Sequence, residues 1–333
     1  MKRKQKRQIG ISVILILCMV IAGLVLAKRN WGTDPGRTEP GYPGERESSL
    51  PEEPGGYSRT EVKKTLVMAV EVPLDAPYGK LAMAYKENVE EMSGGSLSID
   101  IYENGLLGRS AELISSIGDG SNAVDIMLAP VRDLADAGCP DTGKLLEPYS
   151  FDGHAGFLKW ASSREAETLL EEPEKTGLGA RGLFFAEDGF SHLFLKENRM
   201  SVRGKRVAGE ANDESAEYVD RIGGIYDYLP SVDIRDALLS GTLDGVERDC
   251  RFYQENALWE AAPYIVADSH LVSPCEALIK LGSVEKLSAE ELDILKEAGK
   301  TAVEAFTEKV RQEEKDMLDE FTGHGAEVVK LKP

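Results

Sequence analysis

Residues 65–129 read TLVMAVEVPLDAPYGKLAMAYKENVEEMSGGSLSIDIYENGLLGRSAELISSIGDGSNAVDIMLA. Apolar and β-branched residues predict buried strands at Thr65–Val72 and Ala123–Ala129, and alternation predicts a third at Leu97–Tyr102. Apolar residues at helical spacing predict helices at Ala76–Met92 and Ser110–Ile117, which both end at glycines. This order of elements implies parallel strands with right-handed crossovers. The sequence therefore predicts an α/β fold in which ligands bind at the carboxyl ends of the strands.

The second half of the chain again predicts a mixture of strands and helices, although its sequence does not repeat that of the first half. The predicted elements there are two strands and two helices: Gly182–Ala186, Arg206–Gly209, Glu214–Ile222 and Ile234–Leu239. Ser288 and Glu291 have the spacing of a capping box, which predicts a helix from Ala289 to about Phe321. Such a helix is roughly 50 Å long and could span more than one lobe. A last strand is predicted at Ala326–Leu331.

The charge of the chain excludes nucleic acid as a partner. The formal net charge is −19, and seven of the 39 basic residues lie in residues 1–29, which hold no acid. The rest of the chain therefore carries 32 basic against 58 acidic residues. A surface this negative repels phosphate backbones.

The N-terminal segment predicts export. Ile9–Ala27 is an uncharged apolar run of 19 residues behind five basic residues, long enough to cross a membrane as a helix with the N-terminus inside. A signal peptide cleaved after Ala27 is the alternative, but the length of the run favours an uncleaved anchor. Cys18 follows Leu17, which disfavours a lipid-attachment cysteine. Residues 30–62 are rich in Pro, Gly and charge, which predicts a flexible linker.

No residues suggest an enzyme, a cofactor or a metal site. His154, His192, His270 and His324 are isolated in the sequence, with no carboxylate at ligand spacing, and no P-loop, dinucleotide fingerprint or nucleophile elbow is present. The cysteines outside the N-terminal run form no C-x-x-C pair: Cys139, Cys250 and Cys275. One disulfide with one free thiol is possible, but three buried apolar cysteines are favoured.

Short motifs recur in a fixed order along the chain. They are VEEMSGG at Val89–Gly95, NGLLG at Asn104–Gly108, Asp125 on the third strand, EDGF at Glu187–Phe190, GKRV at Gly204–Val207, ALLSGTLDGVE at Ala237–Glu247 and LSAE at Leu287–Glu290. Together, over residues 65–331, they resemble the substrate-binding proteins of TRAP transporters, the DctP-like family.

The resemblance implies a periplasmic-binding-protein-like fold with two α/β lobes, a ligand cleft between them and a long C-terminal helix. We expect an N-terminal anchor or signal peptide at 1–29 and a linker at 30–62. Lobe I is expected at 63–188, completed by about 274–312, and lobe II at 189–273, completed by about 313–333. The resemblance also implies delivery of the solute to membrane permease subunits from an extracytoplasmic position, with the N-terminal segment in the membrane.

The sequence departs from the family where the family binds carboxylates. Ser191 and Ala208 stand where the family keeps arginines, and Arg248 stands where it keeps an asparagine. An arginine can fork onto a carboxylate as few other side chains can. The pocket is therefore predicted to be rebuilt, either around Arg248 as a relocated positive charge or for neutral polar solutes.

The candidate ligand-binding residues are Glu71, Ser191, Arg206, Ala208, Glu247 and Arg248. Three of them have an alternative interpretation without a role in binding. Arg248 could be an exposed loop arginine, Arg206 a solvated partner of a nearby acid, and Glu71 a solvated carboxylate at a strand end. We expect an extracytoplasmic binding protein that captures a small, organic-acid-like solute. The alternatives are a tethered ligand sensor or scaffold, or a binder of neutral polar solutes, while an enzyme on this fold is disfavoured.

Overall fold

The first three strands and two helices form the predicted parallel unit. The computed structural model describes residues 63–198 and 201–331. The unit consists of β1 (Lys64–Ala69), α2 (Pro77–Met92), β2 (Leu97–Tyr102), α3 (Ser110–Ser116) and β3 (Ile126–Pro130). Strand β1 pairs in parallel with both β2 and β3, as the sequence predicts. The third strand begins three residues later than expected.

Two further strands complete this sheet from distant parts of the chain. Strands β4 (Ala180–Ala186) and β10 (Cys275–Lys280) add in antiparallel fashion, which gives the order β2-β1-β3-β10-β4. We refer to this sheet and the helices on it as lobe I. Its other helices are α4 (Val131–Asp136), η1 (Thr142–Leu146), α5 (Gly153–Ala161), α6 (Arg164–Leu169), α7 (Glu172–Lys175) and α11 (Leu281–Val284).

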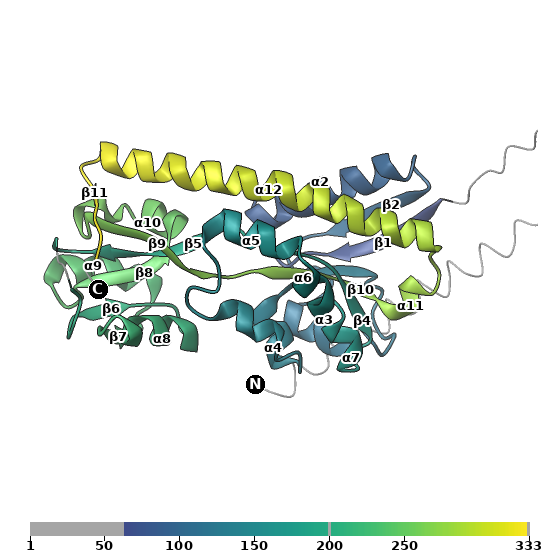
Figure 1. Ribbon diagram of the computed structural model, residues 1–333, viewed down its shortest axis with the longest axis horizontal. Helices are drawn as coiled ribbons and strands as arrows, with labels where there is room; N and C mark the ends of the chain where they lie inside the picture. The colour runs from purple at the N-terminus through teal and green to yellow at the C-terminus, as the bar shows by residue number, and fades with distance from the viewer. Residues whose placement is uncertain (1–62, 199–200, 332–333) are drawn as a thin grey trace, which may run out of the picture. The chain divides into compact units, whose positions relative to one another are not determined.

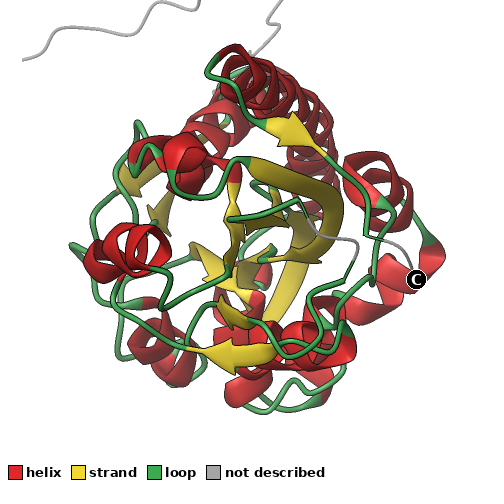
Figure 2. Ribbon diagram, turned by 90° about the vertical axis from the view of Figure 1, so that its left-hand side faces the viewer, coloured by secondary structure: helices red, strands yellow, loops and turns green. Residues whose placement is uncertain are grey.

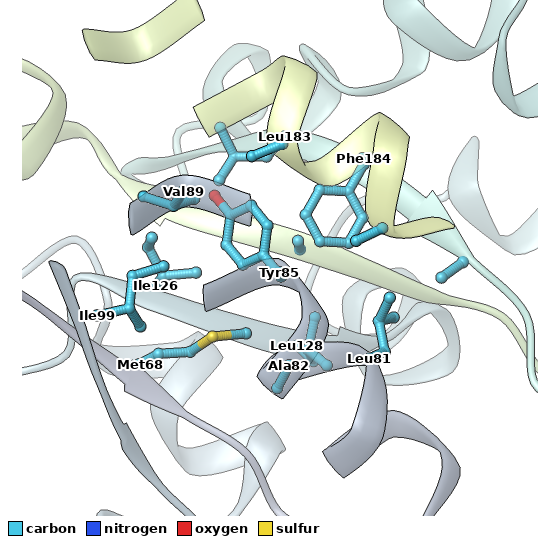
Figure 3. Close-up of a cluster of buried hydrophobic side chains, with 14 of the residues drawn as sticks. Met68, Leu81, Ala82, Tyr85, Val89, Ile99, Ile126, Leu128, Leu183 and Phe184 are labelled. Carbon is cyan, nitrogen blue, oxygen red and sulfur yellow. The ribbon is translucent and has the colours of Figure 1, made fainter. Parts of the chain in front are cut away.

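The core of lobe I joins α2 to the sheet and to the C-terminal helix. Tyr85 of α2 is fully buried and meets the ring of Phe184 on β4 edge to face, with centroids 5.0 Å apart (Figure 3). Met68, Ile99 and Ile126, from the three parallel strands, lie in the same cluster. The apolar spacing of α2 therefore faces the sheet, which explains why this part of the fold could be predicted.

The second sheet has six strands in the order β11-β9-β5-β8-β6-β7. We refer to it and its helices as lobe II. Its strands are β5 (Phe190–Leu195), β6 (Arg206–Ala208), β7 (Ile225–Asp227), β8 (Gly245–Asp249), β9 (Tyr264–Val272) and β11 (Glu327–Val328). Its helices are α8 (Asp213–Arg221), α9 (Ser231–Ser240), α10 (Cys250–Glu255) and η2 (Leu258–Glu260). Seen from the lobe II end, helices lie around the strands (Figure 2).

Helix α12 (Ala289–Gly323) connects the two lobes. The predicted capping box is present, since Ser288 accepts from the Glu291 N–H and the Glu291 side chain accepts from the Ser288 N–H. Figure 1 shows α12 passing both sheets, and it contacts α2 and β4 in lobe I and α10 in lobe II. The strand predicted at Ala326–Leu331 is wrong in extent, because only Glu327–Val328 pair, with β9.

Two short segments also cross between the lobes, Glu187–Gly189 from β4 to β5 and Ser273–Pro274 from β9 to β10. Both sheets belong to one compact unit of the chain, Thr60–Pro333. The residue limits expected for the lobes stay a prediction.

The structure tests the prediction for the cysteines outside the N-terminal run, but it does not describe the predicted membrane anchor. Cys139, Cys250 and Cys275 are buried and free, so the prediction of three apolar cysteines is confirmed over a disulfide. The predicted anchor at Ile9–Ala27, Cys18 and the linker lie outside the described residues. Among the helices of residues 63–198 and 201–331, none is long and apolar enough to span a membrane.

Candidate functional site

The two lobes meet where parallel strands of each end. Arg132 lies in the first turn of α4, directly after β3 of lobe I, and Glu214 lies in the first turn of α8, after β6 of lobe II. The Arg132 guanidinium donates to both carboxylate oxygens of Glu214, at 3.2 and 2.5 Å. This two-pronged ion pair links the lobes at the carboxyl ends of their strands, the position expected for a ligand.

A narrow pocket adjoins this ion pair. Its walls include Ser191 at the start of β5, Glu210 just after β6 and Glu247 on β8. The cavity measures about 10 Å³, which is close to the space that one water molecule needs. In this conformation the pocket has no room for an organic solute, so binding here requires the lobes to move apart.

Glu247 is an ionised carboxylate at the base of this pocket. Its side chain is fully buried, Ser215 Oγ donates to it at 2.6 Å, and His270 Nε2 lies 3.5 Å from its second oxygen. That contact is an ion pair rather than a hydrogen bond. Burial alone would raise the pKa of Glu247, but the nearby His270 and the Ser215 hydrogen bond outweigh it and lower the pKa.

His270 is held between two acids. Its Nδ1 lies 2.6 Å from Asp268, and its ring stacks on Tyr218 with centroids 3.4 Å apart. Burial opposes protonation of the imidazole, but Asp268 and Glu247 together raise its pKa. The positive charge of the His270 imidazolium therefore offsets much of the negative charge of Glu247.

Sequence reasoning missed Asp268 and His270. They lie where β9 carries extra residues opposite β5, since Leu193 pairs with Val266 and Ser191 with Leu271. Such a bulge redirects side chains that simple alternation would place otherwise. A signal was present, because Asp268-Ser269-His270 interrupts an apolar strand of nine residues.

Arg248 points to the opposite face of β8 from Glu247, as strand alternation requires. It is only 7% exposed, its Nη1 donates to the Glu247 carbonyl at 2.9 Å, and its guanidinium lies 5.2 Å from the centre of the Phe252 ring. The interpretation as an exposed loop arginine is therefore wrong. Arg248 lines a second, open cavity of about 500 Å³ together with Glu210, Tyr228 and Asp249 among others.

The remaining predicted residues, Ala208, Arg206 and Glu71, line neither of these two pockets. Ala208, at the end of β6, is fully buried in the core of lobe II. Arg206 is exposed, pairs with Asp227 and lines neither pocket, which fits its role as a solvated partner of an acid. Glu71 follows β1 in lobe I and accepts from the Ser110 N–H at 2.9 Å, and Arg109 lies 3.4 Å away. The Ser110 hydrogen bonds and then Arg109 lower its pKa.

The description of the histidines as isolated is wrong in space. His154 on α5 of lobe I lies 2.8 Å from Glu187 and 3.3 Å from Glu314 of α12. His192 on β5 of lobe II lies 3.2 Å from the same oxygen of Glu314. We refer to these four residues as the hinge cluster, because Glu187 belongs to a segment that crosses between the lobes. The residues in contact, His154 with Glu187 and both histidines with Glu314, are more than 30 residues apart in sequence, so no local spacing could reveal these contacts.

Two further cavities, both much larger than the pocket beside the ion pair, lie elsewhere. One of about 460 Å³ is bounded by α5, α6, β4 and α12 in lobe I, and one of about 860 Å³ by Tyr149, Val266 and Leu331 among others. Neither lies at the carboxyl ends of the parallel strands, so size alone does not mark the site. Within the described part of the chain, no three His, Cys, Asp or Glu side chains are grouped so that they could hold a metal ion.

Comparison with known sequences identifies relatives among solute-binding proteins. Residues 68–333 match the family model DctP, described as bacterial extracellular solute-binding protein, family 7. A solute-binding protein of Chromohalobacter salexigens is 23% identical over 266 residues, which is 74% of each chain. The C4-dicarboxylate-binding protein DctB of Bacillus subtilis is 21% identical, over 76% of this chain and 72% of its own.

Solved structures share the fold. A TRAP periplasmic solute-binding protein from Ochrobactrum anthropi has a TM-score of 0.72 at 20% identity, covering 82% of this chain and 85% of that one. One from Escherichia fergusonii, in an apo open state, has a TM-score of 0.70 at 21% identity, with 80% and 90% covered. One from a Sulfitobacter species with bound β-D-galacturonate has a TM-score of 0.60 at 20% identity, with 80% and 88% covered. This chain therefore belongs to family 7 of the bacterial extracellular solute-binding proteins, the DctP family of TRAP-transporter binding proteins.

Proposed function

We propose that this protein is the extracytoplasmic solute-binding component of a TRAP-type transporter. It captures a small solute with organic-acid character between its lobes and delivers it to the membrane permease subunits. It performs no chemistry, and in this proposal the segment Ile9–Ala27 keeps it at the outer face of the membrane. Relatives named for C4-dicarboxylate binding or solved with a sugar acid support an acidic solute.

The observation that carries the proposal is the placement of polar side chains from both lobes at one site. The ion pair between Arg132 of lobe I and Glu214 of lobe II lies where a ligand is expected, and Glu247 lines the same pocket. A solute that contacts both lobes stabilises the closed arrangement over the open one, which is how such a protein signals that it is loaded.

A thermal-shift screen of the purified protein against organic acids, amino acids, sugars and nucleosides tests the first half of the proposal. A ligand at a hundred times its Kd stabilises the native state by about 2.7 kcal/mol, enough to raise the Tm by several degrees. Absence of any stabilising solute would contradict the proposal.

Proteoliposomes that contain the small and large permease subunits test the second half. With the loaded protein outside, the solute identified in the screen should enter the vesicles, and without the protein it should not. Tight binding without uptake would instead favour a tethered sensor.

A further inference from the structure

Arg248 is a buried cation without a counter-charge. Among the residues that the structure describes, its guanidinium makes no ion pair within 4.0 Å, and the Glu247 carbonyl is the acceptor that it reaches. A desolvated charge that lacks a partner is costly, and a guanidinium has more donors than one carbonyl can satisfy. Because Arg248 lines an open cavity of about 500 Å³, an anionic group of a ligand can reach it.

Glu210 is a carboxylate in the same cavity, also without an ion pair in the described chain. Asn212 Nδ2 donates to it at 3.1 Å. Glu210 keeps contact with solvent, yet desolvation by the surrounding protein raises its pKa, and the charges of Glu247 and Asp249 raise it further against the opposing effect of Arg248 and Arg132. Glu210 lines the same cavity as Arg248, so a cationic group of a ligand in this cavity can reach its carboxylate.

Most other charged groups around the two pockets already have partners. Glu214 is held by Arg132, and Glu247 by Ser215 and His270. Asp249 caps helix α10 by accepting from the Phe252 N–H at 2.7 Å. What remains is the Arg248 guanidinium with two carboxylates, Glu210 and the exposed Glu255 at the end of α10, and Glu210 is the one that also lines the pocket between the lobes.

We propose that the lobe II cavity lined by Arg248 and Glu210, which adjoins the pocket between the lobes at Glu210, binds a small zwitterion, with a carboxylate held by Arg248 and an ammonium group held by Glu210. The solute would be an α- or ω-amino acid or a close analogue. This inference rests on the proposed function and narrows its class of acids. A single guanidinium serves one carboxylate, since Ser191 and Ala208 supply no second arginine, and Glu210 repels the second carboxylate of a dicarboxylic acid.

Calorimetry on the full protein tests this with solutes matched in length. The probes are 4-aminobutyrate, succinate and butyrate, together with the protein α-amino acids and L-malate. We expect one or more zwitterions to bind at least ten-fold more tightly than succinate, L-malate or butyrate.

Substitutions test whether Arg248 binds the carboxylate of the solute and Glu210 its ammonium group. Arg248→Ala should weaken zwitterion binding about thirty-fold or more, as expected for one lost partner of a desolvated charge pair. Arg248→Lys keeps the charge without the fork and should lose less. Glu210→Gln should weaken zwitterions about ten-fold or more and bring succinate closer to them. The control variants Arg235→Ala and Glu260→Gln break an exposed ion pair of lobe II and should stay within two-fold of wild type.

The outcomes separate this inference from the proposed function. If succinate or L-malate binds as tightly as any zwitterion, or if a zwitterion binds equally well to Arg248→Ala and Glu210→Gln, the inference is wrong and the solute-binding function stands. If no solute of any charge class binds, both are wrong.

Discussion

His154 is the residue at which pH should act most directly on the fold. It lies between Glu187 and Glu314, so both ring nitrogens face carboxylates. Burial disfavours the imidazolium, but the two acids outweigh burial and raise the pKa to about 9 from 6.5. A histidine whose pKa is raised in the folded state stabilises the protein fully below the unfolded pKa. That contribution is lost as the pH rises through the folded pKa.

Replacing His154 by Gln should therefore lower the free energy of unfolding by on the order of 2–3 kcal/mol at pH 6, and the difference should shrink as the pH rises through 9. Urea unfolding at pH 6, 7.5 and 9.5 measures this. His324→Gln is the control, because His324 is half exposed beyond the end of α12 and should change neither the stability nor its pH dependence appreciably. An equal loss at all three pH values would show that His154 acts through packing alone.

For single residues, the sequence predicts some members of the candidate site but not the contacts that they make. Glu247 and Arg248 could be found from the D-G-x-E resemblance, and alternation places them on opposite faces of β8. Their environments could not be found, because His270 reaches Glu247 only through the strand order β9-β5-β8 and the bulge in β9. Glu210 was missed since its position, just after a three-residue strand, carries no local signal.

At the scale of elements, α12 depends on one close approach to lobe I. Gly299 lies against Phe184 of β4, and a Cβ at this position would come within 2.1 Å of the Phe184 ring. Alanine normally favours a helix over glycine by up to about 1 kcal/mol. Here the clash should dominate, because Phe184 is buried and packs on Tyr85.

Gly299→Ala should accordingly destabilise the protein by about 1–3 kcal/mol, in the range of overpacked cores. Gly323→Ala is a matched control in the same helix, since a Cβ there meets nothing within 4 Å. It should leave stability unchanged or raise it by a few tenths of a kcal/mol. Both values come from denaturant midpoints at constant slope. If Gly299→Ala proves as stable as Gly323→Ala, the tight packing of α12 on β4 is not real.

Elements with strong local patterns could be predicted, and those defined by partners could not. The capping box and apolar face of α12 give its start and its extent to within two residues. Strands β5, β8, β9 and β10 were not predicted from the sequence, because neighbours from distant parts of the chain bury them and their sequences lack alternation. The helices between Val131 and Lys175 are mostly short, and short helices depend on tertiary contacts rather than on propensity.

At the scale of the whole protein, the connections between the lobes suit rigid-body closure. Two short crossing segments and α12 join the lobes, and the hinge cluster lies where Glu187–Gly189 crosses. The Arg132–Glu214 pair leaves a cavity of only about 10 Å³ beside it. Under the proposed function, a solute enters when this pair opens and is enclosed when the lobes close again. The pair would then exchange its internal contact for contacts with the solute.

Small-angle X-ray scattering of the purified protein, with and without the solute found by the screen, tests this most directly. In this account the free protein in solution samples the open arrangement that a solute needs to enter. At saturation, confirmed by calorimetry on the same sample, the radius of gyration should therefore fall, because ligand contacts from both lobes favour the closed arrangement. A solute from the same screen that does not bind should leave the radius unchanged. A radius of gyration that stays the same with the bound solute at saturation would contradict the closing cleft.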